Sequence, residues 1–103
     1  MKDQINSIGE NMAKVIVTIK IMPVSPETDL EKVQEGALEK IKTFAGEGET
    51  KQEIEPVAFG LKALKITFVM DEAKGATDPL EQEIQTIEGV NSVEVIDVRR
   101  AIG

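Results

Sequence analysis

Two segments of this chain alternate apolar and polar side chains residue by residue, and this period of two restricts both segments to β-strands. The first segment spans residues 14–22 and the second spans residues 64–70. Their apolar faces consist of Val15, Val17, Ile19 and Ile21 in the first and of Leu64, Ile66, Phe68 and Met70 in the second. Because these are the most apolar strands of the chain, we expect both at the centre of a sheet.

Two other segments have the period of a helix. Between Leu30 and Phe44 the apolar residues follow one another at spacings of 3, 4, 4 and 3, and Gly46 ends the pattern. Thr28 and Glu31 have the spacing of a capping box, which predicts the start of this helix. A second helix is expected to begin with Asp78 as its N-cap and to carry an apolar stripe of Leu80, Ile84 and Ile87.

The remaining strands are less apolar. Residues 49–55 are almost all polar, with Ile54 as their only large apolar residue, which is typical of an edge strand. Residues 92–99 form the last expected strand, and the apolar phase changes between Val95 and Ile96. This phase change predicts a β-bulge or two partly covered faces.

The expected order is therefore strand, helix, strand, strand, helix, strand. Two β-α-β halves with right-handed crossovers give a ferredoxin-like α+β fold, in which a four-stranded antiparallel sheet has both helices on one face. The strand over residues 49–55 is the natural edge of this sheet. We expect residues 12–103 to form the domain and residues 1–11 to be a poorly ordered polar N-terminal extension.

The composition excludes much of covalent catalysis. The chain contains no Cys, His, Trp or Tyr, which removes disulfides, thiolate nucleophiles, imidazole bases and Cys or His metal sites. Its net charge of −7 disfavours nucleic acid as a partner. Since its apolar runs are too short to cross a bilayer and residues 1–11 lack the apolar stretch of a secretory signal, we expect a soluble intracellular domain without cofactor, metal or membrane contact.

The usual activities of the expected fold leave two alternatives. A metal chaperone needs a Cys pair, an RNA-recognition domain needs exposed aromatic residues, and an acyl-phosphate hydrolase needs an arginine in a phosphate-binding loop. The chain has no Cys, its only aromatic residues are three Phe, and its arginines stand only at positions 99 and 100. A small-ligand regulatory domain and a protein-interaction domain remain.

The segment over residues 55–66 is unusual for a structural connection because it places Phe59 between two small residues. Composition alone favours a core Phe that plugs the end of the sheet. The alternative is an exposed anchor for a partner, beside a bend that Gly60 permits.

Residues 56–66, Pro-Val-Ala-Phe-Gly-Leu-Lys-Ala-Leu-Lys-Ile, resemble the P-V-G-[YF]-G-[IL]-K-x-L-x-I signature of the elongation factor 1-beta family, in its guanine-nucleotide exchange domain. The resemblance continues through residues 69–81 and covers nearly the whole chain from Met12. The short form, which ends in Asp-Val-Arg-Arg-Ala-Ile-Gly, is similar to the archaeal branch.

This resemblance implies a cytoplasmic guanine-nucleotide exchange factor that binds elongation factor 1-alpha in its GDP-bound and nucleotide-free states, expels GDP and lets GTP load. It implies no covalent chemistry, so the chain would not be an enzyme in that sense, and it agrees with the ferredoxin-like fold reached from the strand and helix patterns. The alternative function is a small-ligand-binding regulatory domain of the same fold.

The resemblance also implies the residues that contact the partner. The aromatic residue at the position of Phe59 contacts the partner, and Gly60 lies beside it in the signature. A basic residue near the C-terminus approaches the partner's magnesium site; alignment from residue 90 matches Arg100 to it, and a slip of one residue matches Arg99. Lys62 and Lys65 could steer the chain toward an acidic partner surface. Ala58 departs from the signature, which has Gly there.

Overall fold

A computed structural model describes residues 14–46 and 48–101. The expected N-terminal extension, residues 1–11, lies outside the described residues. The elements are β2 (Lys14–Pro23), α1 (Leu30–Ala45), β3 (Thr50–Pro56), β4 (Lys62–Asp71), α2 (Asp78–Gln85) and β5 (Val90–Arg100), with short 3₁₀ turns η2 (Ala58–Gly60) and η3 (Glu72–Lys74). The strand and helix order predicted from the periodicities is confirmed.

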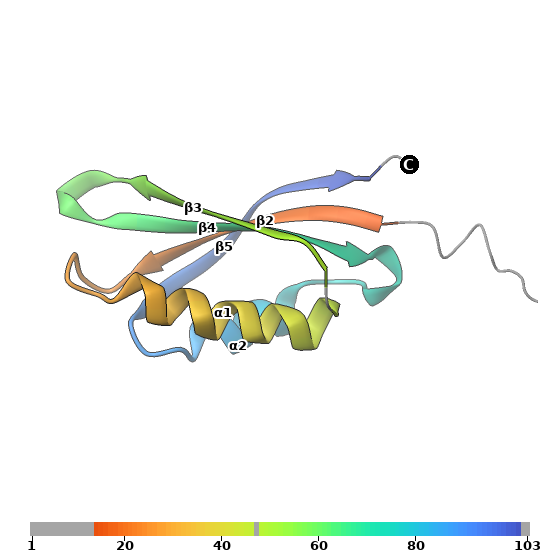
Figure 1. The fold of residues 1–103 in the computed structure, drawn as a ribbon, viewed down its shortest axis with the longest axis horizontal. Coiled ribbons are helices and arrows are strands. Elements are labelled where there is room, and N and C mark those ends of the chain that lie inside the picture. The colour runs from red at the N-terminus through yellow and green to blue at the C-terminus, as the bar shows by residue number, and fades with distance from the viewer. Residues whose placement is uncertain (1–13, 47, 102–103) are drawn as a thin grey trace, which may run out of the picture.

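The four strands form one antiparallel sheet in the order β3-β4-β2-β5. Figure 1 shows α1 and α2 together on one face of this sheet. The ferredoxin-like α+β fold is therefore confirmed, with the two most apolar strands, β2 and β4, at the centre and β3 at an edge. The described elements leave the opposite face, here called the open face, without a helical cover.

The core lies between the sheet and the helices. β2 and β4 supply the alternating residues of their predicted apolar faces, and α1 and α2 supply one stripe each. The buried members are Val17, Ile19, Ile21, Val33, Ala37, Ile41, Leu64, Ile66, Phe68, Met70, Leu80, Ile84 and Val90. Leu30, Phe44 and Ile87, at the ends of the helical stripes, are partly buried against this cluster.

β5 contains the predicted bulge. The pairing shifts by one residue between Thr18, which lies opposite Asp97, and Ile19, which lies opposite Val95, so that Ile96 is the extra residue. Side chains directly opposite in an antiparallel pair share a face. Since Val15 lies opposite Arg100, the bulge sets Arg100 on the core side of the sheet and Arg99 on the open face. Without it, the two arginines would exchange faces.

Both predicted helix caps are wrong by one residue. α1 is capped by Asp29, whose Oδ1 accepts hydrogen bonds from the backbone N–H groups of Glu31 at 3.1 Å and Lys32 at 3.4 Å. Thr28 instead accepts one from the Ser25 backbone N–H at 3.3 Å, in the preceding turn. A carboxylate also interacts more favourably than a hydroxyl with the positive end of the helix dipole.

At α2, Thr77 occupies the N-cap position and Asp78 is the first helical residue. The Thr77 hydroxyl donates a hydrogen bond to Glu81 Oε2 at 2.7 Å. Glu81 thus takes part in the start of this helix through a bond to Thr77 and not through Asp78. Asp78 contributes its negative charge to the first turn, where the helix dipole favours it.

Replacing Asp29 with Ala should lower the free energy of unfolding by about 1 kcal/mol, because two backbone N–H groups lose their acceptor. Asp29→Asn should keep most of this stability, since an amide oxygen can accept the same bonds. Urea unfolding of the two variants measures the difference. Equal stability of the Ala variant and the natural chain would contradict the assigned cap.

Candidate functional site

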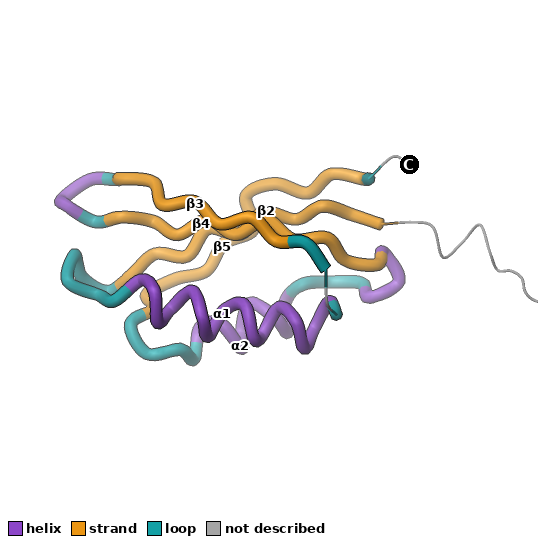
Figure 2. The backbone as a smooth tube through the Cα atoms, in the orientation of Figure 1, coloured by secondary structure: helices purple, strands orange, loops and turns teal. Residues whose placement is uncertain are grey.

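The hairpin between β3 and β4 ends in a short turn that projects at one end of the sheet, and we call residues Val57–Leu61 the hairpin tip. Val57 donates a backbone hydrogen bond to the Leu61 carbonyl at 2.9 Å, and Leu61 donates one to the Ala58 carbonyl at 3.2 Å. Figure 2 shows η2 at this tip and η3 at the opposite end of the sheet. The tip is thus a closed, hydrogen-bonded loop.

Phe59, in the middle of the tip, is 93% exposed. The core interpretation of this residue is therefore wrong, and its exposure agrees with the anchor interpretation. The physical reason is the register: β3 and β4 pair only as far as Pro56 opposite Lys62, so Phe59 lies beyond the last pair and beyond the helix-covered core. An aromatic ring exposed to this degree is available to a partner.

The backbone at Phe59 is also unusual. Its φ of 63° and ψ of 30° lie in the left-handed region, and Phe59 is the only non-glycine residue with positive φ in the described part of the chain. This conformation costs a residue with a Cβ about 1–2 kcal/mol. Such a cost persists where the surrounding structure imposes it, and it is concentrated at functional sites.

Gly60 follows with φ of 75°. A Cβ at this position would lie 3.9 Å from Pro26 Cγ, an ordinary contact, so the backbone conformation and not a lack of space calls for glycine. The same distance shows that the β2–α1 loop lies against the tip.

Lys62 is exposed at the start of β4, whereas the Lys65 ammonium lies 3.7 Å from Glu55 Oε1.

The two arginines lie at the other end of the sheet. Arg100 is opposite Val15, which is opposite Met70 near the end of β4, while Phe59 precedes the start of β4. A strand of this length extends about 30 Å at roughly 3.3 Å per residue. The structure therefore brings Phe59, Gly60 and Lys62 together and brings Arg99 and Arg100 together, but it does not join the two groups.

Each arginine is paired with a carboxylate. Arg99 Nε donates to Asp97 Oδ2 at 2.9 Å, within the same strand, and Arg100 Nη2 donates to Glu72 Oε2 at 2.5 Å, across to η3. Neither Asp97 nor Glu72 is among the site residues expected from the sequence. Asp97 stands two positions before Arg99, a spacing that places both on one face of a strand. The pairing of Glu72 with Arg100 has no such signal in the sequence.

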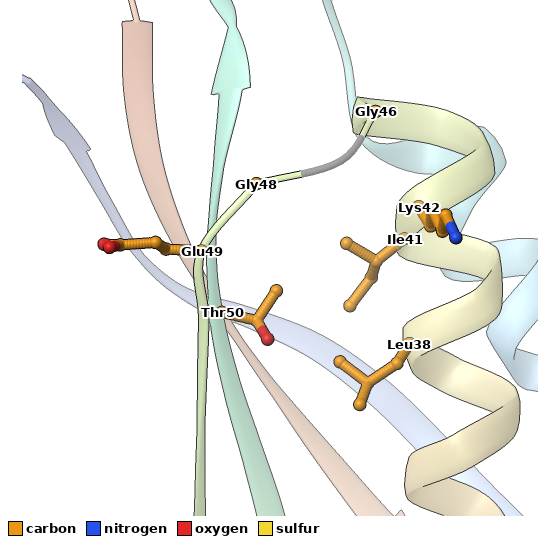
Figure 3. Close-up of a pocket in the computed structure, with 7 residues that line it drawn as sticks. All are labelled: Leu38, Ile41, Lys42, Gly46, Gly48, Glu49 and Thr50. Atoms are coloured by element: carbon orange, nitrogen blue, oxygen red, sulfur yellow. The ribbon is translucent and has the colours of Figure 1, made fainter.

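A groove of about 590 Å³ lies between the C-terminal half of α1 and the start of β3. Figure 3 shows that the side chains of Leu38, Ile41 and Thr50 face it from the two elements, while the Glu49 carboxylate points away. A ligand site requires several polar groups that converge on the ligand. Lys42 and Glu49 also line this groove, but in Figure 3 neither charged group converges with Thr50 on its centre, so the groove gives the small-ligand alternative little support.

Residues 14–46 and 48–101 contain no group of three or more Asp or Glu side chains arranged to hold a metal ion. None of the helices in these ranges is both long enough and apolar enough to span a membrane.

Residues 16–101 match the family model described as the EF-1 guanine nucleotide exchange domain. The chain is similar to elongation factor 1-beta of Methanothermobacter thermautotrophicus, with 44% identity over 89 residues that cover 86% of this chain and 98% of the relative. It is 46% identical over 92 residues to elongation factor 1-beta of Staphylothermus marinus, with the same coverage of 86% and 98%. Elongation factor 1-beta of Methanococcoides burtonii is 38% identical over 94 residues, which cover 88% of this chain and 100% of the relative.

Proposed function

Because this chain belongs to the elongation factor 1-beta family, we propose that it binds elongation factor 1-alpha, promotes the release of GDP and so allows GTP to load. Family membership itself supports a role in nucleotide exchange during translation elongation. The identity of the partner, its nucleotide states and the contacting residues are part of the proposal, as is a cytoplasmic location. No covalent step is required, which suits a chain without Cys or His.

The single observation that carries the proposal is the exposed Phe59 in left-handed backbone at the hairpin tip. An aromatic side chain with two rotatable bonds loses little entropy when a partner buries it, and aromatic residues are frequent among those that dominate binding energy. The tip holds this ring away from the core. Phe59 is therefore the proposed anchor, with Gly60 maintaining the backbone bend and Lys62 adding a positive charge beside it.

Exchange requires a difference in affinity. A factor accelerates GDP release only if it binds the nucleotide-free partner more tightly than the GDP-bound partner, because equal affinities shift no equilibrium. GTPases hold the nucleotide through a phosphate-binding loop and a magnesium ion. A guanidinium brought near that ion opposes its charge and weakens its coordination. Phe59 would supply affinity for the partner. A cation at the arginine end of the sheet, about 30 Å from Phe59, would promote the release of GDP.

Replacing Arg100 with Ala should slow GDP release about tenfold at saturating factor, which corresponds to about 1.4 kcal/mol of the barrier. Arg99→Ala should have a smaller effect, because Arg99 lies on the open face and pairs within its own strand. The measurement is the release of a fluorescent GDP from magnesium-loaded elongation factor 1-alpha. A larger loss for Arg99→Ala would reassign the role to Arg99.

A further inference from the structure

One corner of the sheet is built from four segments that are distant in the sequence. Lys14 lies opposite Asp71 at the start of β2 and the end of β4, and its carbonyl accepts a hydrogen bond from the Ala101 backbone N–H at 2.8 Å. The turn η3 follows Asp71 directly. The ends of β4 and β5, the start of β2 and η3 therefore meet here.

The turn that carries Glu72 is fixed by its own hydrogen bonds. Asp71 Oδ1 accepts one from the Ala73 backbone N–H at 2.9 Å, and Gly75 donates one to the Glu72 carbonyl at 3.1 Å. Gly75 has φ of 80°, which permits the chain to leave the turn at this point. These bonds fix the backbone from which the Glu72 side chain extends toward Arg100.

From this geometry we propose that Glu72 is the positioning residue for Arg100. The inference rests on the proposed function, in which the Arg100 guanidinium acts on the partner. An arginine side chain is long and flexible, and orienting it in advance reduces the entropy that it loses when it reaches the partner's magnesium site in the release step. Glu72 engages Nη2, and the remaining guanidinium N–H groups stay available because the Arg100 side chain is 67% exposed.

The second arginine provides the contrast. Arg99 is held by Asp97 of its own strand, on the open face, so its orientation follows β5 alone. Arg100 instead pairs with Glu72 of η3, which lies 28 positions away in the sequence. Of the two ion pairs, only Arg100–Glu72 makes the direction of an arginine side chain depend on the turn η3.

The test is Glu72→Gln in the GDP-release assay, in the natural background and in the Arg100→Ala background. Exposed ion pairs of this kind contribute modestly, so the maximal release rate should fall about two- to fivefold in the natural background. The factor concentration at half-maximal rate and the unfolding midpoint should not change. In the Arg100→Ala background, Glu72→Gln should have no further effect, because the group it orients is gone.

Glu35→Gln is the matched control, since it removes the same charge from an exposed position on α1 and should leave the rate unchanged. An unchanged or increased rate for Glu72→Gln, or an equal loss in both backgrounds, would overturn the positioning role while leaving the exchange function intact. If the natural chain itself fails to accelerate release, the proposed function fails and this inference fails with it.

Discussion

Replacing Phe59 with Ala should slow GDP release from elongation factor 1-alpha about thirtyfold or more at a fixed, subsaturating concentration of factor. Residues that dominate an interface contribute at least about 2 kcal/mol, and Phe59 is the most exposed large apolar side chain of the described residues. The free energy of unfolding should change by less than about 0.5 kcal/mol, because the ring makes no contribution to the core. The two measurements are the release rate and urea unfolding.

The control for this variant is Ile54→Ala, which removes another exposed apolar side chain, 49% exposed on the edge strand β3 and three residues before the hairpin tip. Release should proceed at the natural rate with this control. An unchanged release rate for Phe59→Ala would contradict the proposed role of Phe59 as the anchor for the partner. A loss of several kcal/mol in stability would mean that the ring packs in the core after all.

Replacing Phe68 with Ala should lower the free energy of unfolding and leave exchange per folded molecule nearly unchanged, the opposite of the effects expected for Phe59→Ala. Phe68 is 1% exposed, on the core face of β4 between Val17 of β2 and Thr50 of β3. Removing a buried Phe ring typically costs about 3–5 kcal/mol, through lost burial and the cavity that remains. That is a large part of the stability of a domain this size, about 5–15 kcal/mol. Urea unfolding measures the loss.

If Phe68→Ala does not fold at the assay temperature, Ile66→Val provides a graded substitute. It removes one methyl group from a fully buried position in the same strand and should cost about 0.5–1.5 kcal/mol. For either variant, exchange per folded molecule should remain close to natural, because the hairpin tip and the arginine end are untouched. A loss below 1 kcal/mol for Phe68→Ala would contradict its place in the core.

The fold could be predicted from the sequence because each element carries its own period. The alternation over residues 14–22 and 64–70 and the stripe from Leu30 to Phe44 each specify one buried face, and the polar strand over residues 49–55 has no such face to bury. Together these patterns admit few topologies. The bulge at Ile96 was also predictable, since a change of apolar phase within one strand requires an extra residue or a second covered face.

The caps were harder to predict because adjacent polar residues compete for the same position. Thr28 and Asp29 both have a side-chain oxygen that can accept the N–H groups of α1, and the spacing to Glu31 favoured Thr28. The decision depends on the turn before the helix, where the Ser25 N–H takes the Thr28 hydroxyl as its acceptor. Local spacing does not contain that information.

The candidate site could be predicted only in part. The resemblance over residues 56–66 identified Phe59, but composition alone favoured a buried ring, because most Phe residues in a domain of this size are buried. Its exposure follows from where the strand pairing ends, which is a property of the register of β3 and β4. The contact between Arg100 and Glu72 similarly depends on how the sheet brings η3 beside the end of β5.

Turnover as an exchange factor can be measured by the rate of fluorescent GDP release from magnesium-loaded elongation factor 1-alpha, with this chain present at about one-hundredth of the GTPase concentration and excess GTP in solution. We expect complete release at a rate that increases linearly with the amount of factor, because each molecule acts repeatedly on successive GTPase molecules. Release at the spontaneous rate, from a sample whose cooperative unfolding shows that it is folded, would contradict the proposed exchange function.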